Sequence, residues 1–232
     1  MISLFRACLL SAILLVSSLA SAGEWRISGN ASAQFQGFVE EPLDPIQSDT
    51  NLSVAARPEF YTDANDGRDM FTFIPFARID QRDEERTHFD IRELKWMHAA
   101  NDWELTVGFD IVFWGVTESQ HLVDIINQTD VVENIDGEDK LGQPMINLSL
   151  IRDWGTLDFF VLTGFRKRNF PGPEGRPRIH PPVNSDAAVF ESDAEEQHID
   201  IAARWSQAIG DWDLGLSHFH GTSRDPRFGI DT

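Results

Sequence analysis

The sequence predicts an all-β protein, an antiparallel transmembrane β-barrel, from three observations. Stretches in which apolar and polar residues alternate recur along most of the chain. The connections between these stretches alternate between short turns and long polar segments. Tryptophans lie close to the short turns, as in residues 101–105, 153–157 and 210–214. Short turns on one side, long loops on the other and aromatic residues at the boundary are typical of outer-membrane barrels.

The first 22 residues have the features of a secretory signal peptide. Arg6 supplies a positive charge, residues 7–16 form an apolar run, and residues 20–22 (Ala-Ser-Ala) offer a cleavage site of small residues. The run is too short for a transmembrane helix, which needs about 20 apolar residues. The alternative is a buried N-terminal helix. We therefore expect residues 1–22 to be a signal peptide and residues 23–232 to be the N-terminal part of a barrel.

Composition argues against nucleic-acid binding and against sites built from cysteine. The 232 residues include 38 Asp and Glu against 19 Lys and Arg, which gives a formal net charge of −19. Nucleic-acid binding is disfavoured, because phosphate contacts need clustered basic residues. Cys8 is the only cysteine and lies in the signal segment, so the mature chain would have neither disulfides nor cysteine metal sites.

Period-two alternation predicts nine strands. The clearest covers residues 24–38, and a phase change near Arg92 and Glu93 indicates a β-bulge in the fourth strand. The strand at 156–165 is apolar on both faces and fits the alternation poorly. The remaining strands are expected near residues 52–60, 70–80, 87–98, 103–111, 146–150 and 198–205, with a ninth after the turn that ends at residue 211.

Because successive strands of an antiparallel barrel run in opposite directions, the connections between them alternate between the two sides of the membrane. Those expected on the periplasmic side are short (residues 62–69, 99–102, 152–155 and 207–211). Three of the four on the opposite side are long (39–50, 117–143 and 166–197, with 81–86 the exception). Six tryptophans then fall near the periplasmic boundary and are expected to form an aromatic girdle. They are Trp25, Trp96, Trp103, Trp154, Trp205 and Trp212.

A strand count of nine does not suit a bacterial single-chain barrel, which uses an even number. The chain ends on residues 228–232, without the terminal aromatic strand that is usual in such proteins. We therefore expect a C-terminally truncated barrel. The alternative is that one strand is miscounted and that eight strands close.

One segment carries a family resemblance. Residues 113–119 (Phe-Trp-Gly-Val-Thr-Glu-Ser), followed by residues 123–130 (Val-Asp-Ile-Ile-Asn-Gln-Thr-Asp), resemble a poorly characterised porin-like family of proteobacterial outer-membrane proteins. In that family a Trp-Gly motif with a nearby Glu or Ser ends a strand, and an Asn and an Asp follow in the next loop. The resemblance implies an outer-membrane location and a pore-like or transport role, with no established substrate and no catalytic residues.

The same segment is the best candidate for a functional site. The long, acidic loop 117–143 has an apolar anchor in Leu122, Ile125 and Ile126, and we expect it to fold into the barrel lumen as a constriction. A mobile extracellular loop with no pore role is the alternative. In the lumen, three loop acids would face four wall arginines and create a transverse field. The acids are Glu118, Asp124 and Asp130, and the arginines are Arg57, Arg78, Arg92 and Arg204.

Signals for chemistry are weak. No nucleophile elbow, phosphate loop or zinc motif is present, so we expect no enzyme activity and no cofactor. Two Asp- and Asn-rich turns (63–69 and 134–139) lack the full calcium-loop pattern, so no metal site is expected. The proline-rich basic stretch 166–184 would contact either lipopolysaccharide phosphates or acidic neighbours.

The sequence thus predicts an exported outer-membrane porin that passes small solutes passively. Its expected partners are outer-membrane lipid, lipopolysaccharide and the barrel-assembly machinery, and its oligomeric state is left open. Two alternatives remain. One is a narrow, filled barrel that acts as a structural or adhesive surface protein, and the other is a secreted carbohydrate-binding β-sandwich.

Overall fold

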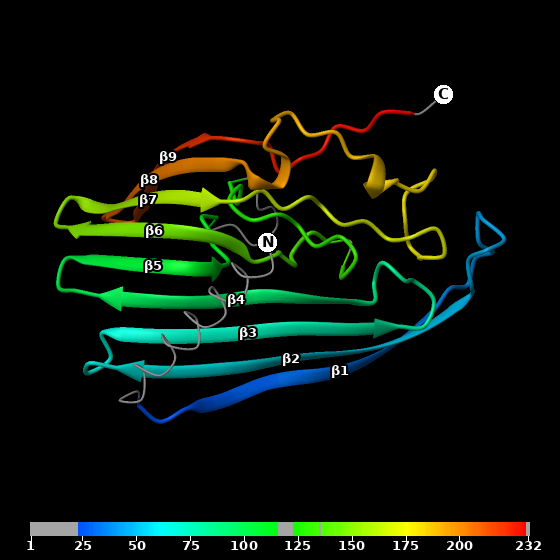
Figure 1. The fold of residues 1–232 in the computed structure, drawn as a ribbon, viewed down its shortest axis with the longest axis horizontal. Coiled ribbons are helices and arrows are strands. Elements are labelled where there is room, and N and C mark those ends of the chain that lie inside the picture. The colour runs from blue at the N-terminus through cyan, green and yellow to red at the C-terminus, as the bar shows by residue number, and fades with distance from the viewer. Residues whose placement is uncertain (1–22, 116–122, 135, 231–232) are drawn as a thin grey trace, which may run out of the picture.

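The computed structural model describes residues 23–115, 123–134 and 136–230, so the predicted signal peptide lies outside the described residues. Nine antiparallel strands form one open sheet in which each strand pairs with its neighbours in the sequence (Figure 1). The predicted all-β class and the nine strands are confirmed. Because the described strands belong to a single sheet, they do not form the two packed layers of a β-sandwich.

The strands are longest in the first half of the chain and shorter after it. Their bounds are β1 Arg26–Gly37, β2 Thr50–Ala64, β3 Asp69–Asp80, β4 His88–Ala99, β5 Trp103–Asp110, β6 Gln143–Arg152, β7 Gly155–Thr163, β8 Ile199–Ile209 and β9 Trp212–His220. Two 3-10 turns, η1 (Ser185–Ala187) and η2 (Glu195–Gln197), interrupt the connection from β7 to β8. Neither described helix is long or apolar enough to cross a membrane.

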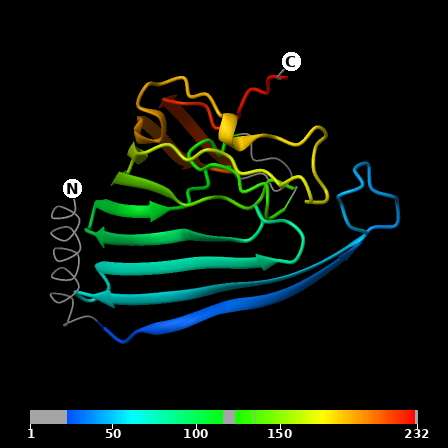
Figure 2. The ribbon, with the colours of Figure 1, turned by 45° about the vertical axis from the view of Figure 1, so that its right-hand side comes forward.

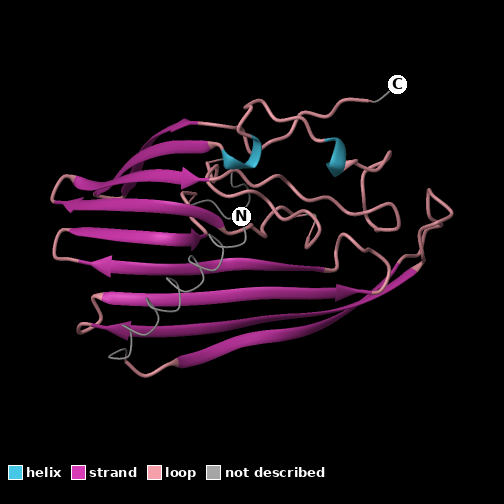
Figure 3. Ribbon diagram, viewed as in Figure 1, coloured by secondary structure: helices cyan, strands magenta, loops and turns pink. Residues whose placement is uncertain are grey.

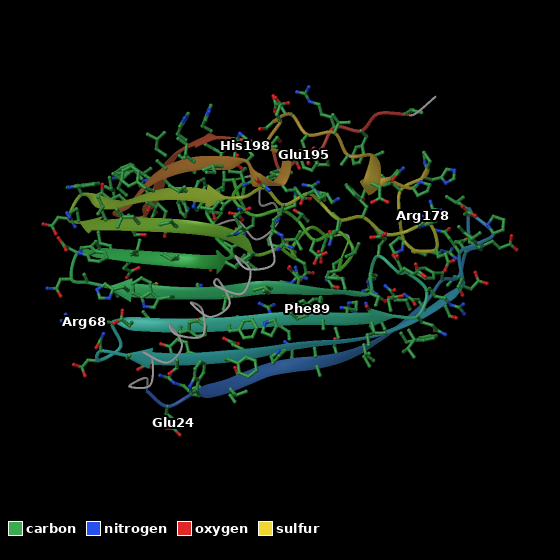
Figure 4. All side chains as sticks on the ribbon, viewed as in Figure 1. Glu24, Arg68, Phe89, Arg178, Glu195 and His198 are labelled. Atoms are coloured by element: carbon green, nitrogen blue, oxygen red, sulfur yellow. The ribbon has the colours of Figure 1, made fainter. Side chains whose placement is uncertain are left out.

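The connections are sorted by length between the two ends of the sheet (Figure 3). Residues 65–68, 100–102, 153–154 and 210–211 form short turns at one end. Residues 38–49, 81–87, 111–142 and 164–198 form the connections at the other end. Figure 4 marks the two ends by Arg68, in a short turn, and Arg178, in a long loop. We call them the short-turn end and the long-loop end.

The two faces of the sheet differ in chemistry. One face, here the apolar face, leaves large hydrophobic side chains in contact with solvent: Ile27 is 70% exposed, Ile79 67% and Leu216 71%. The opposite, polar face carries cross-strand neighbours such as Gln34 and Ser53. Soluble monomers rarely expose a contiguous apolar surface of this extent.

The hydrophobic core lies on the polar face, between the sheet and the loop 111–142. Trp114 and Ile126 of the loop pack with side chains of β6, β7 and β8, namely Met145, Phe160, Leu162 and Ala202. The core explains why β7 is apolar on both sides, because Phe160 and Leu162 lie under the loop while Phe159 and Val161 belong to the apolar face.

The predicted bulge in β4 is confirmed. Ile74 of β3 lies opposite Glu93, whereas the next residue, Pro75, lies opposite Ile91, so Arg92 has no partner in the register. The extra residue keeps alternation intact on both sides of it. As a result His88, Asp90 and Arg92 all reach into the interior below the loop.

Candidate functional site

The site is the contact between the polar face and the described part of the long loop, residues 123–134 and 136–142, which we call the anchored loop. Arginines from β3, β4 and the β3–β4 connection bind this loop through its carboxylates and carbonyls. Gly142 ends the loop against β4, where a Cβ atom would lie 2.4 Å from the carbonyl oxygens of Ile91 and Arg92. Only glycine permits that approach.

Arg78 makes the most extensive contact. Its Nε lies 2.8 Å from Oε1 of Glu133 and its Nη2 lies 2.6 Å from Oε2, in a two-pronged arrangement. Both side chains are more than 90% buried. Two parallel charge-assisted hydrogen bonds fix the orientation of the carboxylate as well as its position.

Arg92, the bulge residue, donates to Asp130 of the anchored loop and, from Nη1, to the carbonyl of Lys140 at 3.0 Å. Asn169 donates to the other Asp130 oxygen, Oδ1, at 2.6 Å, and the Nε2 atom of His88 lies 3.6 Å from Oδ2. Burial alone would raise the pKa of Asp130, but the His88 ring and the Arg92 charge outweigh it and lower this pKa to about 2. Asp130 is therefore a carboxylate at any ordinary pH.

Arg86 completes the attachment through the backbone. It donates to the carbonyl oxygens of Val132, at 2.8 Å, and Glu133, at 3.2 Å. Its Nη1 atom also lies 2.8 Å from Asp80 at the end of β3. The short stretch from Asp130 to Glu133 is thus held by three buried arginines of one region of the sheet.

The beginning of the loop is held by its own side chains. Asp124 accepts hydrogen bonds from the backbone N–H groups of Trp114 and Gly115, at 2.5 and 2.8 Å. The amide of Asn127 accepts from Val112 and donates to the carbonyl of Leu141. These bonds close the loop on itself and place Trp114 against Phe160, with ring centroids 5.6 Å apart.

The structure brings together some of the residues predicted to face each other. Asp130 meets Arg92 as expected, while Arg78 meets Glu133, which was not among the selected acids. Arg57 lies exposed on the polar face and pairs with no described carboxylate. Arg204 lies over the ring of Trp114, 5.6 Å from its centroid. Glu118 lies outside the described residues.

Of the six tryptophans predicted as a girdle, five lie in or within four residues of a short turn or immediately before β1, and Trp205 lies further from the turn, in β8. Trp96, Trp103 and Trp205 have side chains on the apolar face, as the register of β4, β5 and β8 requires. Trp205 donates from its indole N–H to the carbonyl of Trp154 at 3.0 Å. Trp25, Trp154 and Trp212 are half or more exposed. The seventh tryptophan, Trp114, is buried on the polar face.

The basic stretch 166–184 of loop 164–198 is tied largely to acidic neighbours. Arg166 binds Asp90 at 2.8 Å, Arg168 binds Asp225 at 2.8 Å and Arg178 binds Asp44 at 3.1 Å. Arg176 also donates to the carbonyl of Glu40, so loop 164–198 contacts loop 38–49. Both loops lie at the long-loop end of the sheet (Figure 2). A cavity of about 720 Å³ lies between this loop and β4, and both acidic and basic side chains line it.

No protein-family model, no curated protein and no solved structure matches this chain. Among the described residues, no three His, Cys, Asp or Glu side chains are placed to bind a metal ion.

Proposed function

We propose that the protein is a porin-like channel of the bacterial outer membrane, in which the sheet forms part of the wall of a β-barrel. The apolar face would contact lipid and the polar face would line the passage for small solutes. The proposal also includes three predictions from the sequence: the family resemblance, the signal peptide and the contacts with lipopolysaccharide.

The observation that carries the proposal is the inverted distribution of side chains between the two faces. Ile27 of β1, Ile79 of β3 and Leu216 of β9 are exposed on the apolar face, while ionised side chains such as Asp130 and Arg92 are buried on the other side. A soluble protein arranges these groups the other way round. Alternation of apolar-out and polar-in along every strand is the pattern of a transmembrane barrel strand.

The anchored loop supplies the constriction in this proposal. It covers the polar face over the long-loop half of β3 to β8, and three buried arginines hold it there. A loop held by this many buried polar contacts stays in place in the passage, because detaching it would break several buried ion pairs and hydrogen bonds at once. Two of its carboxylates, those of Asp130 and Glu133, act as anchors.

The test is conductance of the full-length protein in planar lipid bilayers. We expect stepwise, ohmic current increments after addition of detergent-solubilised, folded protein. A folded protein that partitions into membranes without conducting would instead support a filled barrel with a structural role. A protein that washes off outer membranes without detergent would contradict the membrane location itself.

A further inference from the structure

The anchored loop does not set the charge preference of the proposed channel. The carboxylates of Asp130 and Glu133 are each paired with an arginine and are almost inaccessible. Opposite charges in contact largely cancel at the distance of a passing solute. Selection by charge must therefore come from another part of the polar face.

A row of polar side chains crosses five strands directly beyond the core, on its short-turn side. Glu104 of β5 lies opposite Ser149 of β6, Ser149 opposite Asp158 of β7, Asp158 opposite Arg204 of β8, and Arg204 opposite Ser217 of β9. We call these five residues the polar row. In the adjacent row toward the long-loop end, Phe160 and Ala202 already belong to the core beneath the loop.

The charges of the polar row are not used for internal pairing. Asp158 accepts a hydrogen bond of 2.6 Å from Ser149 and forms no ion pair with the adjacent Arg204 within the described residues. The Arg204 guanidinium lies over the Trp114 ring and extends beside Gly215, where a Cβ atom would approach it to 3.3 Å. Glu104 likewise has no described cationic partner.

We propose that Glu104 and Asp158 select solutes by charge and make the channel prefer small cations, with Arg204 opposing them. This inference rests on the proposed function. The strands that carry the two carboxylates, β5 and β7, are two strand spacings apart, roughly 10 Å. A small solvated cation that passes the polar row is therefore attracted by both. The row carries two carboxylates against one guanidinium, and its negative charge adds to a chain whose formal net charge is −19.

The experiment measures the zero-current potential of the full-length protein in planar bilayers across a KCl gradient at neutral pH. The wild-type protein should favour K⁺ over Cl⁻. The double variant Glu104→Gln, Asp158→Asn should lower the K⁺-to-Cl⁻ permeability ratio roughly threefold at moderate salt, and Arg204→Gln should raise it. Asp211→Asn, in the exposed turn between β8 and β9, is the matched control and should change nothing.

The outcomes separate the two proposals. Suppose that the wild-type protein conducts, but that the permeability ratio is the same in both variants as in the wild type, or shifts in the same direction in both. That result overturns the role of the polar row and leaves the proposed channel intact. A ratio that changes equally in Asp211→Asn also overturns it. A wild-type protein that folds into the bilayer and does not conduct overturns the proposed function, and this inference falls with it.

Discussion

The carboxylate of Glu133 lies in the fork of the Arg78 guanidinium, with Nη2 2.6 Å from Oε2 and Nε 2.8 Å from Oε1. One partner is in mid-loop and the other is in β3, 55 residues away along the chain. Because both side chains are buried, the pair fixes the loop to the sheet and neither charge faces solvent. The loop is accordingly a fixed part of the polar face.

The first prediction concerns this pair. Glu133→Ala should loosen the anchored loop by about 3–5 kcal/mol, because Arg78 is left as an uncompensated buried charge. Hydrogen exchange of the loop amides measures the effect. The double variant Arg78→Ala, Glu133→Ala should recover part of the loss, since no charge is then left unpaired. Equal damage in the single and double variants would show that the two residues do not act as a pair.

The second prediction concerns pH. The pKa of Asp130 lies below the ordinary value of 3.8, at about 2, so the folded state favours the carboxylate. Its contribution, about 2 kcal/mol from the size of the shift, is complete above pH 4 and lost as the pH falls toward 2. Protease cleavage within the anchored loop should therefore accelerate between pH 4 and pH 2, as measured with an acid-active protease.

Asp130→Asn is the matched control for that experiment. The amide keeps the shape of the side chain but cannot titrate. The variant should be cleaved at a faster rate already at pH 5 and should lose most of the acid-induced change. An acid response of the same size in the variant and the wild-type protein would assign the effect to another group.

The third prediction concerns the approach of the loop to the bulge. Gly142→Ala should destabilise the protein by roughly 1–3 kcal/mol, because the new methyl group overlaps the carbonyl oxygens of Ile91 and Arg92. Chemical denaturation in detergent micelles measures the change. Gly37→Ala is the control, since a Cβ there meets only Phe35, at 3.7 Å. Comparable losses in the two variants would contradict the close approach.

The fourth prediction uses adjacent residues of β1 on opposite faces. Ala33 lies on the apolar face and Ser32 on the polar face, and both are exposed. Ala33→Arg should reduce folding into lipid vesicles, because an arginine near the bilayer midplane costs about 2–4 kcal/mol. Ser32→Arg should fold normally. In a soluble protein both substitutions would be harmless, so equal behaviour of the two variants counts against the lipid-facing sheet.

The sequence pattern was sufficient for much of the fold. The nine strands were predicted, although the one at 156–165 fitted the alternation poorly, and the change of phase near Arg92 located the bulge. Strand ends were less accurate, and β6 extends from Gln143 to Arg152 where only residues 146–150 were expected. The extension places Met145 in the core below the loop, a contact that depends on the path of a distant segment.

The candidate site was predictable only in part. The sequence indicated that acids of the long loop would meet arginines of the strands, and Asp130 with Arg92 follows that expectation. The partner of Arg78 was missed, because periodicity describes strands and says nothing about where Glu133 lies in an irregular loop. The bulk of Trp114 occupies the place opposite Arg204, where a loop carboxylate had been expected.

The most direct test of a sheet whose apolar face contacts lipid is to measure the accessibility of single side chains along β1 to a water-soluble reagent, with the protein folded in lipid vesicles. Cys8 is the only natural cysteine, so single cysteines can be placed at residues 30–33 in a Cys8→Ser background. We predict that Ala31→Cys and Ala33→Cys resist a water-soluble thiol reagent and that a fluorophore there is quenched by brominated lipid tails. Asn30→Cys and Ser32→Cys should react readily and escape quenching. Equal reactivity at all four positions, without quenching, would contradict a sheet whose apolar face contacts lipid.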